Sequence, residues 1–407
     1  MDVQKLLTKA ISYHNCNRMR EAEVLYRDIL RVSSGHPVAS VLLAKILLSG
    51  GRLSEIEGLL SRVLSEHTYY MQAYNTAGDY FGQIGKEEKA MLLYRKALLL
   101  DPAQSAPLVS LANIMQSKNE LDSRVNNSIL GSYRKAVINQ PKFIPAINNL
   151  AAMQLKMRRP NEALATLARA NDINGTSVRS IAYKTIALLG AGRVSEANEL
   201  IGFDTLVCSK TIDLEDSSCD LNGFNKELTK ALLAHPNLTS DWDPKKRAIR
   251  GGTIVPRLFE YEAPILGLLK NVLIKSIDKY ISCLPSNLEH PYLARKPKRY
   301  AIDIWGNILR SNDHQSGHIH NQGWMSGVYY VSMPPISKKD DDFAGWIEFN
   351  RPGYGLPLLG GERHIRKIEP QPGMLIMFPS YVWHGTIPFF SEGDRMSIAF
   401  DLHTEES

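Results

Sequence analysis

The chain has 407 residues, of which 44% are hydrophobic and 22% are charged, with a formal net charge of +6 at pH 7. A chain of this length exceeds one ordinary domain, so at least two domains are expected. The net charge is too small for the length to favour a nucleic-acid-binding protein, and no apolar run is long enough to predict a membrane span. Residues 1–5 fit the start of a helix rather than a signal peptide.

The cysteines predict free thiols. Cys16, Cys208, Cys219 and Cys283 are widely spaced and form no Cys-x-x-Cys motif. Isolated cysteines in a chain of this size are typical of a reduced compartment, so a cytoplasmic location is expected.

The first half of the chain has a 34-residue period. Small residues recur at this interval at Ala10, Ala44, Gly78 and Ala112. This is the period of tetratricopeptide repeats, in which each unit is a pair of helices that pack closely at small residues. Between five and six units are predicted over residues 3–201, with five inserted residues within 118–127. The most complete unit has its pattern residues at Tyr74, Ala77, Gly78, Phe81, Ala90, Tyr94, Ala97 and Pro102.

A solenoid of such repeats binds its partners through its concave face. Polar residues such as Asn148 and Asn149 on a first helix are candidates for gripping an extended protein or peptide segment. Self-association through the repeats is the alternative, and the pattern itself does not choose between the two.

The segment after the repeats changes character. Residues 202–222 lack periodicity and are predicted to form a linker. Residues 224–235 and 263–282 have amphipathic helical patterns. Two basic segments, 245–247 and 295–299, have no interleaved aromatic residues, so solvated loops are favoured over a nucleic-acid-binding surface.

The C-terminal segment contains a group of histidines and an arginine in a strand-like context. His318 and His320 are two residues apart, so both imidazoles point to one side if the segment is extended. His384 follows an apolar strand-like run, and distant strands brought together could close a metal site around the three rings. Arg395 and Ser397 alternate with apolar residues on a last predicted strand and so face the opposite side from them.

This order of residues resembles the 2-oxoglutarate- and Fe(II)-dependent oxygenases, and in particular a group often attached to tetratricopeptide repeats. The matching segments are His318-Ile-His320, Trp324-Met-Ser326-Gly327-Val-Tyr329-Tyr330-Val, Pro372-Gly373, Phe378-Pro379-Ser380 and His384-Gly385. Most relatives use two histidines and one acidic residue as a facial triad on iron, whereas position 320 here is a histidine. Gln322 or a water molecule is therefore an alternative third ligand.

The resemblance implies a role for each of these residues. His318, His320 and His384 would hold Fe(II), and the chain would supply no catalytic group beyond the metal centre. Arg395 would bind the far carboxylate of 2-oxoglutarate as a bidentate donor, with Ser397 and Asn307 as further contacts. Molecular oxygen would be the second cosubstrate, and ascorbate is a candidate reductant.

The sequence thus predicts a multidomain α + β protein. Residues 1–201 would form a tetratricopeptide solenoid, 202–222 a linker and 223–407 a double-stranded β-helix, or jelly-roll, with buttressing helices. The predicted function is hydroxylation of a protein or peptide presented by the repeats. The alternatives are a small-metabolite oxygenase whose repeats serve assembly, and a repeat scaffold with a degenerate, non-catalytic barrel. Because the predicted site residues all lie beyond residue 300, removing residues 1 to about 201 is expected to leave a domain that still binds iron.

Overall fold

The computed structural model describes residues 2–118, 123–171, 177–214, 219–243, 248–335 and 342–405. The predicted insertion within 118–127 and the basic segment 245–247 therefore lie partly or wholly outside the described residues. The chain divides into two compact units, residues 1–150 and residues 151–407. Each unit has its own architecture and is described by itself.

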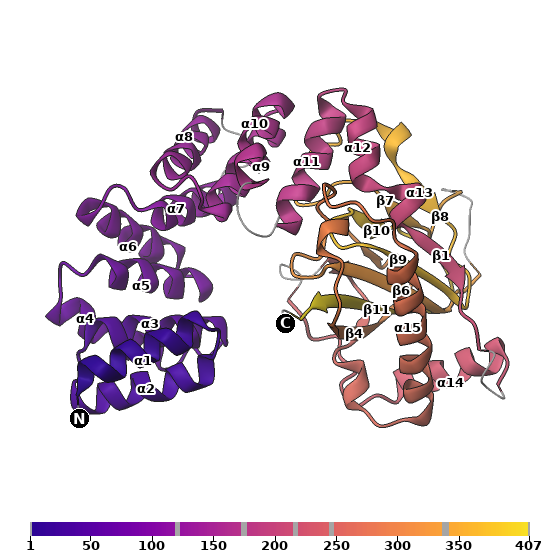
Figure 1. Cartoon of the computed structure of the whole chain (residues 1–407), viewed down its shortest axis with the longest axis horizontal. Coiled ribbons are helices and arrows are strands. Elements are labelled where there is room, and N and C mark those ends of the chain that lie inside the picture. The colour runs from indigo at the N-terminus through magenta and orange to yellow at the C-terminus, as the bar shows by residue number, and fades with distance from the viewer. Residues whose placement is uncertain are drawn as a thin grey trace. The chain divides into compact units, whose positions relative to one another are not determined.

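The first unit consists of helices joined in antiparallel pairs, as the 34-residue period predicts (Figure 1). Its helices are α1 (Val3–Asn15), α2 (Met19–Val32), α3 (Pro37–Ser49), α4 (Ile56–Glu66), α5 (Met71–Gln83), α6 (Glu87–Leu100), α7 (Ser105–Lys118), α8 (Ser123–Asn139) and the first half of α9 (Ile144–Lys156). The boundary between the two units falls within α9.

Small residues at the repeat positions allow the paired helices to approach each other. Ala10, Ala44 and Ala112 are completely buried. Gly78 on α5 lies against the ring of Tyr94 on α6, where an added Cβ would come within 2.5 Å of the ring. A side chain larger than glycine would therefore push these helices apart. The 34-residue spacing marks close helix contacts.

The second unit begins with more repeat helices, which are followed by antiparallel sheets. The helices are the rest of α9, α10 (Pro160–Asn171), α11 (Val178–Gly190), α12 (Val194–Ile201) and the short α13 (Phe203–Leu206). Two longer helices follow, α14 (Leu221–Leu233) and α15 (Pro264–Cys283). The strands are β1 (Cys208–Thr211), β2 (Ile249–Arg250), β3 (Thr253–Val255), β4 (Tyr300–Leu309), β5 (His314–Gln315), β6 (Met325–Ser332), β7 (Ile347–Phe349), β8 (Arg366–Ile368), β9 (Met374–Pro379), β10 (His384–Thr386) and β11 (Arg395–Thr404).

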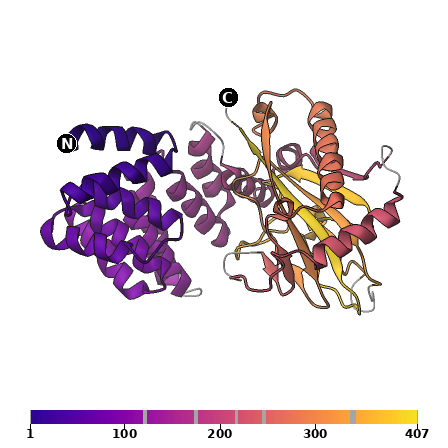
Figure 2. The same ribbon diagram turned by 90° about the horizontal axis from the view of Figure 1, so that it is seen from below.

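The strands form a larger sheet in the order β1-β9-β6-β11-β4-β3 and a smaller one in the order β10-β7-β8, and all of these pairs are antiparallel. The orange and yellow strands run side by side in Figure 2. Two strands, β2 and β5, form a separate pair. Both main sheets end in edge strands, so the hydrogen bonding establishes open antiparallel sheets. This strand pairing does not by itself establish the predicted jelly-roll.

Helices α14 and α15 pack on the larger sheet, as the amphipathic patterns predict. The ring of Phe224 on α14 lies edge-on to Tyr329 of β6, with the ring centroids 6.3 Å apart. The hydroxyl of Tyr329 donates to the side-chain oxygen of Asn225 at 2.5 Å. Leu266, Leu269 and the other apolar residues of the α15 stripe are buried in the same core.

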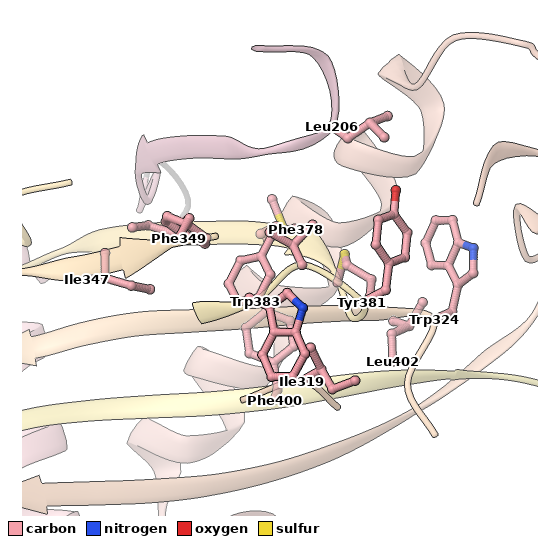
Figure 3. Packing of buried hydrophobic residues seen from close by; sticks show 14 of the residues in the cluster. Leu206, Ile319, Trp324, Ile347, Phe349, Phe378, Tyr381, Trp383, Phe400 and Leu402 are labelled. Carbon is pink, nitrogen blue, oxygen red and sulfur yellow. The ribbon is translucent and has the colours of Figure 1, made fainter. Parts of the chain in front are cut away.

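The boundary between the units differs from the predicted one. One hydrophobic core runs from Ala151 on α9 through α10–α12 to Leu402 on β11. Figure 3 shows part of this core, including Phe378, Tyr381 and Trp383. The predicted linker also contains regular structure, because β1 pairs with β9. A strand of four residues is too short to show a period of its own, so the sequence pattern did not indicate it.

In the described part of the chain, no helix is both long enough and apolar enough to cross a membrane.

Candidate metal centre

Two segments of backbone bring the histidines together. His318 and His320 follow β5, and His384 is the first residue of β10. The backbone N–H of His318 donates to the carbonyl of His384 at 2.9 Å, and the N–H of His384 donates back at 3.1 Å. The N–H of His320 donates to the carbonyl of Ser380 at 3.1 Å. These short bridges fix the segments without side-chain contacts, which leaves the rings free to converge.

The three imidazoles converge on one point. Each residue offers a ligand atom within 4.8 Å of the other two. The Nδ1 atoms of His318 and His384 lie 2.8 and 3.0 Å from the backbone carbonyls of Ser316 and Val382. A carbonyl can only accept, so Nδ1 carries the proton in both rings and Nε2 keeps its lone pair. This orientation suits metal coordination through Nε2.

Burial keeps two of the rings neutral. Burial, together with the neighbouring His320, lowers the pKa of His318 to about 3. Burial and the other two histidines hold the pKa of His384 well below its ordinary value. Neutral imidazole is the form that binds a metal, so both rings are ready to act as ligands at neutral pH.

His320 is held by a carboxylate that the sequence analysis did not identify. The Nδ1 of His320 lies 2.7 Å from an oxygen of Asp401, and the other carboxylate oxygen accepts from Ser326 at 2.7 Å. Burial raises the pKa of Asp401, but His320 and Ser326 outweigh this effect and the net pKa is lowered. The relatives' acidic ligand is thus replaced by a histidine whose partner is acidic. The negative charge of Asp401 therefore lies behind the ring of His320, and the imidazole separates it from the position that a metal would occupy.

The alternation on β11 could have identified Asp401. Arg395, Ser397, Ala399 and Asp401 occupy alternate positions, and Met396, Ile398, Phe400 and Leu402 between them enter the core. A carboxylate on the same face as Arg395 is unusual in a buried strand. Its histidine partner is 81 positions away in the sequence, so only the fold could show the pairing.

The arginine lies in the same cavity as the histidines. A narrow internal cavity of about 30 Å³ is lined by all three histidines, Arg395 and Asn307, among others. Arg395 is only 2% exposed, and its Nε has no hydrogen-bond partner. The guanidinium carbon lies 5.0 Å from the ring centroid of Tyr330, and the buried hydroxyl of Tyr330 interacts with the guanidinium.

Burial lowers the pKa of Arg395 from its ordinary value. Within the described residues, no carboxylate lies within ion-pairing distance of this side chain. A buried guanidinium without a counter-ion is costly, so the arrangement calls for an anion in the cavity. The open donor of Arg395 suits an anionic group, and the partnerless Nε2 of His320 suits a metal ion.

Two of the residues predicted from the sequence, Ser397 and Gln322, do not line the inner cavity. Ser397 pairs with Asn307 across β11 and β4 and is 2% exposed, but it does not line the cavity. The register between β11 and β6 shifts between Met396 and Ser397, and such a bulge re-aims the neighbouring side chains. Gln322 is exposed and lies in an outer cleft, whereas His320 lines the inner cavity.

The outer cleft reaches the histidines from the surface. It has a volume of about 800 Å³ and includes His318, His320, Tyr354, Asp303 and His403 in its lining. His318 and His320 line both the cleft and the inner cavity. A molecule in the cleft would therefore meet the ring cluster on the side away from Arg395.

Glycines bring the site loops into contact. An added Cβ on Gly353 would lie 1.6 Å from the carbonyl oxygen of Gly317, the residue before His318. An added Cβ on Gly385, the residue after His384, would lie 2.8 Å from the carbonyl oxygen of Gln315. Backbone contacts this close leave no room for side chains, so these glycines set the distances between the segments that carry the histidines.

Comparison with known families identifies two parts of the chain. Residues 303–401 match the family described as "Putative 2OG-Fe(II) oxygenase", and residues 72–104 match the tetratricopeptide repeat family. The chain carries a tetratricopeptide repeat and a C-terminal domain of this oxygenase family. Both parts of the resemblance drawn from the sequence are thereby confirmed.

One curated protein resembles part of the chain at low sequence identity. The human protein O-mannosyl-transferase TMTC1 is 25% identical over 146 residues, which make up 35% of this chain and 16% of that protein. This chain thus spans about a sixth of that relative's length.

Similar solved structures match about half of the chain. One is pilF from Pseudomonas aeruginosa, with 14% identity and a TM-score of 0.42, covering 50% of this chain and 90% of that one. Another is TTC0263, a thermophilic TPR protein in Thermus thermophilus, with 17% identity and a TM-score of 0.40, covering 46% of this chain and 99% of that one. Similarities of this size carry no information on function.

Proposed function

We propose that the protein is an Fe(II)- and 2-oxoglutarate-dependent dioxygenase that hydroxylates a protein or peptide substrate. The observation that carries this proposal is the shared cavity of three histidines and a buried arginine that has no carboxylate counter-ion among the described residues. The sheets around this cavity would form the double-stranded β-helix that the sequence predicts. The match of residues 303–401 to the oxygenase family supports the same assignment.

In this proposal, His318, His320 and His384 hold the iron through Nε2. The bound iron would supply the activation of oxygen, and the chain's own residues would orient the reactants. Asp401 fixes the ring of His320 by accepting from its Nδ1, and the carbonyls of Ser316 and Val382 do the same for the other two rings. With all three rings oriented in advance, binding would need little rearrangement.

Arg395 would receive the far carboxylate of 2-oxoglutarate. Its planar group can donate two parallel hydrogen bonds to a carboxylate, and the surroundings exclude water, which strengthens them. Asn307 lines the same cavity and is positioned as a further polar contact. Ser397, which does not line the cavity, is the weaker of the predicted contacts.

The substrate would enter through the outer cleft. Its lining combines charged and aromatic side chains, including Asp303, His403 and Tyr354. Tetratricopeptide repeats generally bind proteins or peptides through their concave surface. A protein substrate held by the repeats, with one side chain inserted into the cleft, is the arrangement that this architecture favours.

One observation favours a second candidate, a repeat scaffold with a non-catalytic domain. The inner cavity of about 30 Å³ has room for about two water molecules. Binding of a five-carbon dicarboxylate would require its lining side chains to move apart. Direct measurement of cosubstrate binding decides between the two candidates.

Replacing Arg395 should remove cosubstrate binding without removing metal binding. Two charge-assisted hydrogen bonds at about 1.5–3 kcal/mol each correspond to a loss of about 100-fold or more in 2-oxoglutarate affinity for Arg395→Met. Arg395→Lys keeps the charge but loses the paired donors, so an intermediate loss is expected. The measurement is an anaerobic titration of the visible charge-transfer band of the Fe(II)–2-oxoglutarate chelate.

The control is Arg310→Ala, because Arg310 is a cation of the same region whose side chain is 71% exposed. It should leave the titration unchanged. Unaltered 2-oxoglutarate affinity in Arg395→Met would show that this arginine is structural. A wild-type protein that gives no chelate band at all would favour the non-catalytic scaffold.

Replacing Asp401 should weaken the metal site selectively. Asp401→Asn keeps the size of the side chain but removes the charge that orients His320, so metal affinity should fall about 10- to 100-fold. Asp303 faces Asp401 directly across β4 and β11, and its side chain is 78% exposed, so Asp303→Asn is the matched control. Equal metal affinities in the two variants, measured by competition with a chelating dye, would rule out this role for Asp401.

A further inference from the structure

We propose that Trp383 and Tyr381 are positioning residues through which the last repeat helices, α11 and α12, hold the metal ligand His384. This inference rests on the proposed function, because it takes His384 to be a ligand. In this proposal, the last pair of repeat helices helps to hold the metal site in place. The repeat pattern in the sequence predicts only partner binding or assembly for these helices.

The first observation is that both side chains are anchored to repeat helices. The indole N–H of Trp383 donates to the carbonyl of Ala182 on α11 at 3.1 Å. The hydroxyl of Tyr381 donates to the carbonyl of Leu200 on α12 at 2.7 Å. Trp383 is 1% exposed and Tyr381 is 2% exposed, so water cannot replace these acceptors. Both side chains are labelled in Figure 3.

The packing around Trp383 reinforces the anchor. The ring of Tyr183 on α11 lies nearly parallel to the indole, with the ring centroids 6.4 Å apart and an interplanar angle of 13°. The ring of Tyr354, from the loop that lines the outer cleft, lies edge-on to the indole at 5.2 Å. The indole is therefore held between a repeat helix and the wall of the cleft.

The second observation is that the anchored segment controls the orientation of His384. The residue between the two anchors is Val382, and its carbonyl accepts from Nδ1 of His384 at 3.0 Å. The carbonyl of Trp383 accepts from the backbone N–H of Asn350 at 2.8 Å. Side chains fixed by the repeats thus set the one peptide carbonyl that orients the His384 ring. A change at either anchor would move that carbonyl.

The metal site should therefore respond to changes at the repeat contact, even though none of the described residues that line the inner cavity belongs to the repeats. A shift of the Val382 carbonyl would allow the His384 ring to rotate. Metal affinity and the ligand field of the bound ion are sensitive to such rotation, because changes in the groups that orient a ligand typically alter affinity about 10- to 100-fold.

The test is the substitution Trp383→Phe in the full chain, with Co(II) as a spectroscopic probe in place of iron. Phenylalanine keeps an aromatic ring but lacks the N–H that reaches Ala182. Co(II) is added anaerobically, and its visible absorption is followed to give both affinity and band positions. We expect about tenfold weaker binding and a shift in the absorption bands.

The matched control is Trp324→Phe. Trp324 is also buried, and its indole N–H also donates to a backbone carbonyl, that of Tyr292, at 3.1 Å. Its ring stacks on Tyr292 with the centroids 4.2 Å apart, so losing this donor should lower thermal stability to a similar extent. Trp383 lies immediately before His384, whereas Trp324 is not adjacent to any histidine of the cluster. The Trp324→Phe variant should therefore keep the wild-type Co(II) affinity and spectrum.

A milder variant covers the case in which Trp383→Phe does not fold. Tyr381→Phe removes only the hydroxyl that reaches Leu200, and it should shift the Co(II) bands in the same direction with a smaller change in affinity. Wild-type spectra in both folded variants, or equal changes in the Trp324→Phe control, would overturn the positioning role. If wild-type protein binds no Co(II), the metal site itself is refuted, so the two failures are distinguishable.

Discussion

Substituting His384 by alanine should abolish metal binding. His384 supplies one of the three ligand atoms that lie within 4.8 Å of one another, and two neutral imidazoles alone bind a divalent ion weakly. We expect metal affinity to fall more than about 100-fold, beyond the range seen when only a supporting residue is lost. Turnover of 2-oxoglutarate to succinate should disappear with it.

The loss should also be visible in thermal stability, independently of activity. A ligand present at about 100 times its dissociation constant stabilises the folded state by about 2.7 kcal/mol. Addition of Fe(II) under anaerobic conditions should therefore raise the unfolding temperature of the wild-type protein and leave that of His384→Ala unchanged. His364→Ala is the control, since His364 lies outside the cluster, and it should retain the increase. An undiminished increase in His384→Ala would contradict the metal site.

Removing residues 1–201 should prevent the remaining chain from folding into a stable domain. This expectation reverses the one drawn from the sequence, because α10–α12 belong to the same hydrophobic core as the sheets. The deletion would uncover Trp383 and Tyr381 and take away the carbonyls to which they donate. Water can replace these carbonyls once the rings are uncovered, so the cost comes from newly exposed apolar surface. It amounts to about 1.5–3 kcal/mol for each large apolar side chain that was fully buried, against a total stability of about 5–15 kcal/mol for a typical domain.

The informative comparison is with a shorter deletion. A protein of residues 142–407 retains all of α9 and the whole core that begins at Ala151, so it should be soluble and unfold cooperatively. A protein of residues 202–407 should aggregate or unfold without a cooperative transition. Circular dichroism melting and size-exclusion chromatography measure both properties. A stable 202–407 protein with full metal affinity would show that the repeat contact has no structural role and would also weaken the positioning proposal.

The residues of the candidate site were largely predictable from the sequence. The interval between His318 and His320, and the alternation around Arg395, depend only on the two-residue period of extended chain. That period fixes which side chains share a face, whatever the rest of the fold does. The structure brings these residues to one cavity, and their roles in metal and cosubstrate binding remain predictions.

The supporting residues could not be found in this way. Asp401 contacts His320 across 81 positions, and Trp383 contacts Ala182 across 201 positions. No local period relates such distant residues, because their contact depends on how the sheets and helices pack. A buried strand and an aromatic segment were visible in the sequence, but neither indicated which partner its residues would meet.

The division of the chain into two units could not be predicted from a local period either. The 34-residue period by itself determined that helix pairs run through residues 3–201, because close helix contacts need small residues at fixed intervals. It could not show that the last of these helices would leave the solenoid's core and join that of the oxygenase domain. Only the tertiary structure decided this, since each repeat has the same internal pattern whether it packs on another repeat or, like α11 and α12, on the loop that carries His384.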